Sequence, residues 1–79
     1  MNIFMYFKED EPEHMKEEEQ MAMASRLMQI RYSLSYTEGA MAEKLRVSCE
    51  RYRKLEQGKE GLTRKDYMQA LRRAYEINS

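Results

Sequence analysis

Residues 37–58 contain two short helical patterns that are separated by only a few residues, and this arrangement limits the folds open to the chain. Thr37 and Ser48 are each placed to cap the start of one pattern, and Gly58 is a natural residue to end the second. The first pattern has its apolar residues on one face: Met41, Ala42 and Leu45. The second has Tyr52 and Leu55 facing inward. Two short helices joined by a three-residue turn are typical of a helix-turn-helix.

Helical periodicity is also present from Glu11 to about Ser33 and after Thr63, whereas residues 1–9 hold an isolated apolar patch of strand-like composition. The sequence therefore predicts an all-α domain of four to five helices. From Glu11 to about Ser33 the expected core face consists of Ala24, Leu27, Met28, Ile30 and Leu34. Thr63 and Asp66 predict a capping box before a stripe made of Tyr67, Met68, Leu71, Ala74 and Tyr75. The predicted common core is Leu27, Ile30, Met41, Ala42, Leu45, Val47, Tyr52, Leu55 and Leu71. Glycine occurs three times and proline once, and strand-like alternation is nearly absent.

The distribution of charge divides the chain into two parts. Residues 1–20 form an acidic N-terminal arm with a short apolar start, and two lysines against seven acidic residues give it a net charge of −5. Residues 21–79 carry a net charge of +5 and contain the helix-turn-helix domain. A basic body with an acidic arm is compatible with a polyanionic partner.

Composition points away from several other classes of protein. The single cysteine cannot form an internal disulfide, and His14 and the acidic run offer no converging metal ligands, so we expect no metal and no cofactor. No apolar run reaches the roughly 20 residues that cross a bilayer, and the first residues do not resemble a secretory signal, so a cytoplasmic protein is expected. No nucleophile–base pair, phosphate-binding glycine loop or paired buried carboxylates indicate an enzyme.

The second helix of the motif has a dense polar face. Its outward positions are Cys49, Glu50, Arg51, Arg53 and Lys54. In a helix-turn-helix the second helix lies in the major groove of double-stranded DNA, where its first turns meet base edges and basic residues reach phosphates. The three cations repel one another unless an anion lies opposite, which favours a DNA partner. An ordinary solvated helix face is the alternative.

The stretch "RLMQIRYSLSYTEGAMAEKLRVSCERYRKLEQGK", residues 26–59, resembles the Cro/repressor-like (XRE-type) helix-turn-helix family. The shared skeleton is Leu27, Ile30, Arg31, Thr37, Met41-Ala42-Glu43-Lys44-Leu45, Val47-Ser48 and Leu55-Glu56-Gln57-Gly58-Lys59. The resemblance implies a lambda-repressor-like fold in which Arg31 and Glu56 form an ion pair between the first and third helices. Arg46 stands where the family usually has glycine, at a position that often needs a positive φ.

The resemblance also assigns candidate DNA-binding residues. The full set is Thr37, Glu38, Ser48, Cys49, Glu50, Arg51, Arg53, Lys54 and Lys59. Base-reading positions of the family fall on Cys49, Glu50 and Lys54, with Arg51 and Arg53 near the DNA backbone. The start of the preceding helix falls where the family often contacts phosphate.

These assignments imply a sequence-specific DNA-binding transcriptional regulator, a repressor that occupies an operator as a homodimer and is nucleoid-associated when bound. The alternative is a protein–protein interaction module or antitoxin-like adaptor with little DNA binding, which Glu38, Arg46, Glu50 and the acidic arm favour. The chain ends after the family's fourth helix, so a dimer is expected to use other apolar residues: Ile3, Phe4, Tyr6, Phe7, Tyr75 and Ile77. A redox role for Cys49 is suggested only by its position, and the alternative is an inert cysteine, as most single cysteines are.

Overall fold

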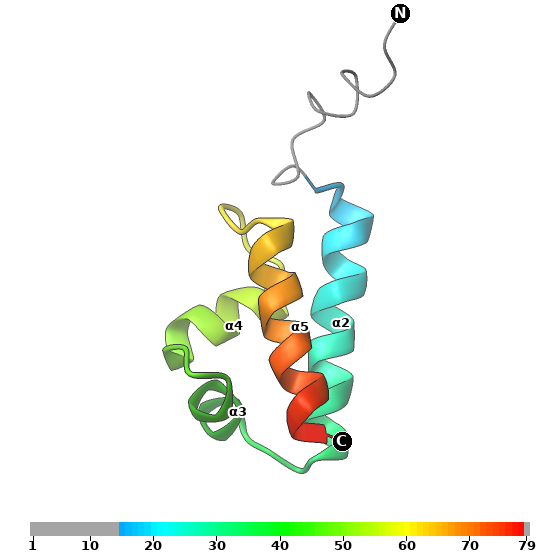
Figure 1. Ribbon diagram of the computed structural model, residues 1–79. Helices are drawn as coiled ribbons and strands as arrows, with labels where there is room; N and C mark the ends of the chain where they lie inside the picture. The colour runs from blue at the N-terminus through cyan, green and yellow to red at the C-terminus, as the bar shows by residue number, and fades with distance from the viewer. Residues whose placement is uncertain (1–14, 79) are drawn as a thin grey trace, which may run out of the picture.

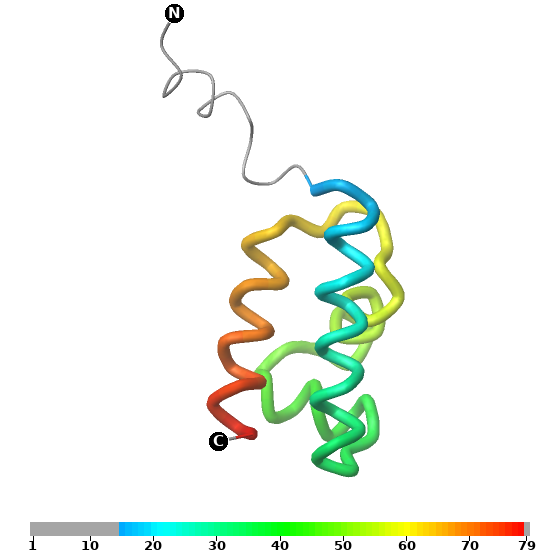
Figure 2. The backbone as a smooth tube through the Cα atoms, turned by 90° about the vertical axis from the view of Figure 1, so that its right-hand side faces the viewer, coloured from blue at the N-terminus to red at the C-terminus, as the bar shows by residue number. Residues whose placement is uncertain are grey.

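Residues 15–78, the part of the chain that the computed structural model describes, form an all-α domain, as the sequence predicts (Figure 1). Its helices are α2 (Glu17–Ser33), α3 (Glu38–Leu45), α4 (Cys49–Gln57) and α5 (Arg64–Asn78). Helices α2 and α5 lie side by side and run in the same direction (Figure 2). Helices α3 and α4 pack across one side of this pair, so the helix-turn-helix rests on a two-helix support.

Three helix starts are fixed by side-chain caps at the predicted residues. The Thr37 hydroxyl accepts a hydrogen bond from the Ala40 backbone N–H at 3.1 Å, and the Ser48 hydroxyl accepts one from Arg51 N–H at 3.0 Å. At the start of α5, the Thr63 N–H donates to the Asp66 carboxylate and the Asp66 N–H donates to the Thr63 hydroxyl. These bonds satisfy backbone donors that a helix N-terminus leaves without intrahelical partners.

The first described helix begins later than the sequence pattern predicts. Lys16 has an extended backbone conformation and α2 starts at Glu17, so a continuous helix from Glu11 is wrong; residues 11–14 lie outside the described part. The acidic run at Glu17–Glu19 occupies the first turn, where it complements the positive end of the helix dipole. The predicted boundary between an arm (1–20) and a domain (21–79) therefore falls inside α2. Gln20 belongs to the packed domain, because its side-chain amide donates to the Tyr67 hydroxyl and to the Lys59 carbonyl.

The core contains the side chains that the periodicity selects from α2, α3 and α4. Seven of the nine predicted core residues are buried: Leu27, Ile30, Met41, Ala42, Leu45, Tyr52 and Leu55. The other two, Val47 and Leu71, are half-buried and pack against this cluster. The remaining buried apolar residues are Ala24, Tyr67, Ala70 and Ala74. One core therefore joins all four described helices.

The predicted apolar faces of α2 and α5 need correction. Met68 and Tyr75 lie on the exposed side of α5, whereas Ala70 is buried in the core. Small side chains let two helices approach closely, and the alanines of α5 occupy the side that packs in the core. On α2, Met23 rather than Met28 packs against the core. Bulky apolar residues are thus left on the outside of α5.

The turn between α3 and α4 has the conformation that the resemblance implies. Arg46 is in the left-handed region, with φ 63° and ψ 41°, and its long side chain is exposed. This conformation is sterically unfavourable for a residue other than glycine, because the Cβ atom crowds the backbone. The turn is held by a hydrogen bond from Val47 N–H to the Ala42 carbonyl and by a 2.7 Å bond from the Arg73 guanidinium to the Leu45 carbonyl. Helix α5 therefore helps to fix the angle between α3 and α4.

Candidate nucleic-acid interface

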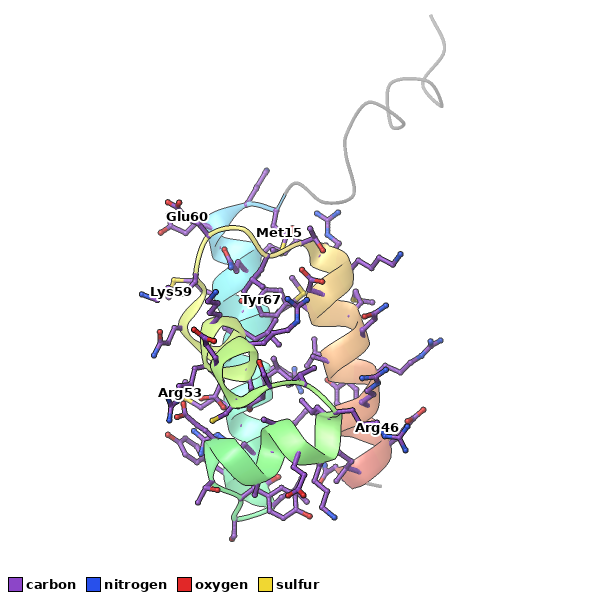
Figure 3. The ribbon with its side chains drawn as sticks, turned by 90° about the vertical axis from the view of Figure 1, so that its left-hand side faces the viewer. Met15, Arg46, Arg53, Lys59, Glu60 and Tyr67 are labelled. Carbon is purple, nitrogen blue, oxygen red and sulfur yellow. The ribbon has the colours of Figure 1, made fainter. Side chains whose placement is uncertain are left out.

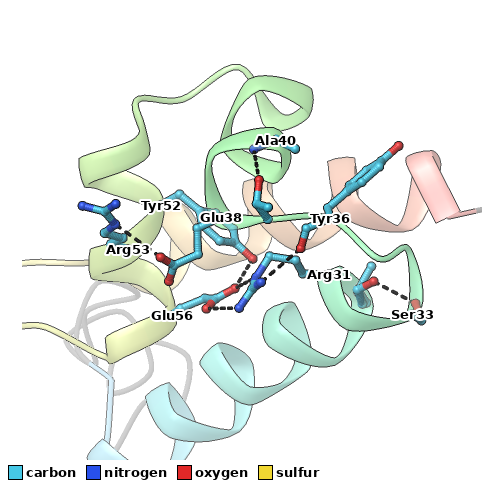
Figure 4. A network of polar contacts seen from close by, with 10 residues as sticks. Arg31, Ser33, Tyr36, Glu38, Ala40, Tyr52, Arg53 and Glu56 are labelled. Carbon is cyan, nitrogen blue, oxygen red and sulfur yellow. Dashed lines mark hydrogen bonds and ion pairs between the residues drawn. The ribbon is translucent and has the colours of Figure 1, made fainter.

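A buried polar network sets the position of α4 against α2 (Figure 4). Arg31 makes two parallel contacts with the Glu56 carboxylate, 2.6 Å from Nε to Oε2 and 3.1 Å from Nη2 to Oε1. The Tyr52 hydroxyl donates to the same carboxylate, and Arg31 Nη1 donates to the Tyr36 carbonyl at 3.1 Å. Glu56 is only 7 % exposed, so these donors replace its hydration. The predicted ion pair between Arg31 and Glu56 is confirmed.

The network also stabilises the protonated forms of its donors. The hydrogen bond to Glu56 is the largest cause that raises the pKa of Arg31. Burial, followed by the hydrogen bond to Glu56, raises the pKa of the Tyr52 hydroxyl. Both groups therefore remain donors to Glu56 throughout the physiological range, which keeps α4 in one orientation.

This raised pKa predicts a loss of stability in alkaline solution. The unfolded chain releases the Tyr52 proton near the ordinary tyrosine pKa of about 10, whereas the folded protein retains it. The stabilising contribution is therefore complete below about pH 10 and is lost as the pH rises toward the folded-state pKa. Urea unfolding between about pH 8 and about pH 11 should show this decline, and Tyr52→Phe should make it shallower. The exposed-site control Tyr32→Phe should decline like the parent. If Tyr52→Phe does too, another group causes the loss.

We use the term α4 face for Cys49, Glu50, Arg51, Arg53 and Lys54, the residues predicted to point outward from α4. The last four of these side chains are exposed, whereas Tyr52 and Leu55 are buried beneath them. Figure 3 looks onto the side of the molecule that carries α3 and α4, and there Arg53 and Lys59 project outward. Arg46 projects from the opposite side of this view, beside the C-terminal part of α5.

Two arginines of the α4 face have carboxylate partners within the chain. The Arg51 guanidinium lies 2.7 Å from Asp66 at the start of α5, and Arg53 Nε lies 3.3 Å from Glu38 at the start of α3. Both arginine side chains are about half exposed to solvent, and such pairs contribute at most about 1 kcal/mol each. The carboxylates of Asp66 and Glu38 therefore already neutralise these two arginines in the absence of DNA. A phosphate group can compete for either arginine at little cost in stability.

Asp66 is held in its charged form although it is partly buried. Burial raises the pKa of this carboxyl, but hydrogen bonds from Thr63 and the charge of Arg51 outweigh it and lower the pKa below its ordinary value. Asp66 therefore serves two roles at neutral pH, as the cap of α5 and as the counter-ion of Arg51.

The lysines of the candidate site differ from the arginines. Within residues 15–78, neither Lys54 nor Lys59 has an ion-pair partner, and both are exposed. An ammonium group without an internal counter-ion is available to an external anion without prior exchange. Glu50 is likewise exposed and unpaired within this part of the chain, so the α4 face presents both signs of charge.

The other candidate residues are placed as follows. The hydroxyls of Thr37 and Ser48 accept backbone N–H bonds as caps, but a hydroxyl keeps its own O–H to donate to an acceptor such as phosphate. Glu38 begins α3 and is turned toward Arg53. Cys49 is half-buried and packs against the core, so it is not fully on the open side of α4.

Sequence reasoning did not find the partners of the two arginines. Each pair joins residues 15 positions apart on different helices, and helical periodicity identifies only neighbours three or four positions apart. It also missed the bond from Arg73 to the turn. No signal in the sequence could have found these contacts without the helix packing.

Comparison with known proteins adds no further assignment, because no family model, curated protein or solved structure matches the chain. Within the described residues, no helix has both the length and the apolar character needed to cross a bilayer.

Proposed function

We propose that the chain is a sequence-specific DNA-binding transcriptional regulator that reads the major groove with α4. The observation that carries the proposal is the exposed, polar α4 face on a helix-turn-helix whose orientation is fixed by a buried ion pair. A rigid helix with one solvated side meets the requirement for insertion into a groove about as wide as a helix. The resemblance of residues 26–59 to the Cro/repressor-like family supports the same function.

In this proposal some residues of the site contact bases and others contact phosphates. Lys54 and Glu50 read base edges, because both are exposed on α4; Glu50 can accept a hydrogen bond from a cytosine amino group. Lys59 and the two arginines neutralise phosphates, the arginines after leaving their internal carboxylates. The proposed regulator works as a homodimer that occupies two half-sites about one helical turn apart, and it is a cytoplasmic, non-enzymatic protein that is nucleoid-associated when bound to DNA.

A second candidate function is a protein–protein interaction module, or an antitoxin-like adaptor, on the same scaffold. The observation that favours it is the set of charges on the α4 face. Arg51 and Arg53 already have carboxylate partners, and Glu50 points an additional negative charge outward. A surface with alternating charges suits a protein partner better than a uniformly negative duplex.

Binding to random-sequence DNA pools across a salt series separates these functions. The regulator should enrich a palindromic sequence, and its binding constant should fall steeply with salt because each neutralised phosphate releases counter-ions. The DNA retained by the protein should be sequenced at low and at intermediate salt. Absence of DNA binding even at low salt would contradict the regulator function and favour the protein–protein interaction module.

A further inference from the structure

The exposed side of α5 carries an apolar surface that the fold uses only in part, because Leu71 also packs against the core whereas Met68 and Tyr75 are exposed. We call it the α5 face, formed by Met68, Leu71 and Tyr75, and these residues line a shallow depression together with Arg72 and Glu76. Met68 is 58 % exposed and Tyr75 is 48 % exposed, which makes them two of the four exposed large apolar side chains of residues 15–78. Of the other two, Tyr32 has the Arg31 guanidinium over its ring. Exposure of these apolar side chains to water is unfavourable, and no packing among the described helices removes that exposure.

We infer that the α5 face binds a second copy of this chain, with the two α5 helices antiparallel across a two-fold axis. A two-fold interface must be self-complementary. Positions 68 and 75 are placed symmetrically about a point between Leu71 and Arg72, so Met68 of each copy meets Tyr75 of the other. Sulfur–aromatic contacts of this kind are favourable. The two Leu71 side chains then meet at the centre.

The charges beside the α5 face fit the same arrangement. Lys65 and Glu76 flank the apolar stripe near its two ends. In the antiparallel two-fold arrangement, Lys65 and Glu76 of both copies lie on the same flank of the helix pair. Lys65 of each copy is then next to Glu76 of the other, which gives two contacts between opposite charges. Arg72 lies close to the axis, where it approaches its own symmetry copy. It should therefore add nothing to the stability of the dimer.

The α5 face is also mechanically connected to the proposed DNA-reading unit. Arg73, adjacent to Arg72 in sequence, donates to the Leu45 carbonyl at the end of α3. Pairing through α5 therefore presents both helix-turn-helix units in a fixed orientation. The inference rests on the proposed regulator for its purpose, since two half-sites require two copies. A single helix face is smaller than a standard interface, so we expect a dimer that forms at micromolar concentrations.

Sedimentation of the full chain over a concentration series, without DNA, tests this interface separately from DNA binding. The parent should change from monomer to dimer, and Met68→Glu should weaken association about a hundredfold, because each substitution occurs twice in a two-fold interface. The matched control is Met21→Glu, which changes an equally exposed methionine on α2 and should leave association unchanged. Circular dichroism should show both variants folded.

Charge reversal provides a second test that does not alter the apolar residues. Lys65→Glu alone should weaken the dimer, the double variant Lys65→Glu/Glu76→Lys should restore it, and Arg72→Ala should not weaken it. A parent that stays monomeric at the highest concentration would overturn the inference. So would a dimer that is insensitive to Met68→Glu, including one that is instead lost when residues 1–9 are deleted, which would place the interface on the N-terminal apolar segment. If the dimer behaves as expected but DNA is not bound, only the proposed function fails.

Discussion

Replacing Leu45 by alanine should lower the free energy of unfolding by about 2–5 kcal/mol. Leu45 is fully buried at the end of α3, in the cluster that joins all four described helices. The substitution removes apolar burial and leaves a cavity that a close-packed core cannot fully collapse. A domain of this size has only a modest margin of stability, so a loss at the upper end of this range unfolds most of the protein.

Urea unfolding followed by circular dichroism measures this effect. Met21→Ala is the matched control, because Met21 is 62 % exposed and its truncation should change stability by less than about 0.5 kcal/mol. A Leu45→Ala variant that unfolds at the same urea concentration as the parent would show that α3 does not pack as described.

Replacing Arg31 by methionine should be about as damaging, with a loss of about 3–5 kcal/mol. The substitution keeps much of the side-chain volume but leaves the Glu56 carboxylate buried, with Tyr52 as its remaining side-chain donor. An uncompensated buried charge costs much more than the intact pair gains. Arg53→Met removes a similar ion pair from an exposed site, and its cost should stay below about 1 kcal/mol.

The double variant Arg31→Met/Glu56→Gln identifies the cause. A glutamine removes the buried charge while its carbonyl oxygen can still accept from Tyr52, so the double variant should be more stable than Arg31→Met alone. If the single substitution is as mild as Arg53→Met, or the double variant is less stable still, the pair does not hold α4 against α2 as described.

The parts of the fold that depend on local chemistry could be predicted from the sequence. Thr37, Ser48 and Thr63 were recognisable as caps because each bonds a backbone group three residues away. Helical periodicity also predicted Leu27 and Leu45 as core residues, because it depends only on the spacing of apolar residues within one helix. The rotation of α5 about its own axis could not be predicted, since it depends on which side packs best in the core.

The candidate site was predictable only in part, for the same reason. The polar character of the α4 face follows from the two inward positions Tyr52 and Leu55, and the exposure of Lys54 agrees with that pattern. The carboxylates that neutralise Arg51 and Arg53 come from α5 and α3, and only the packing of helices brings them near. The pair between Arg31 and Glu56 was expected from the resemblance to a family, not from periodicity.

The most direct test of the central claim compares two neighbouring cations of α4 on DNA. Binding of Lys54→Ala and Arg53→Ala should be measured on the enriched duplex, on single-base variants of it and on random duplex, across a salt series. Because Arg53→Ala also leaves Glu38 unpaired at the interface, Arg53→Ala/Glu38→Gln is the matched control that removes this extra negative charge. Each variant needs a circular dichroism spectrum equal to that of the parent.

If α4 reads the major groove, Lys54→Ala should relax the preference at one position of each half-site and cost about 1–3 kcal/mol on the enriched duplex. Arg53→Ala, with or without Glu38→Gln, should instead weaken binding to all sequences alike and reduce the salt slope by about one unit for each phosphate that the protein no longer neutralises. The contradicting result is that both substitutions leave DNA binding unchanged while they abolish the capture of a protein partner.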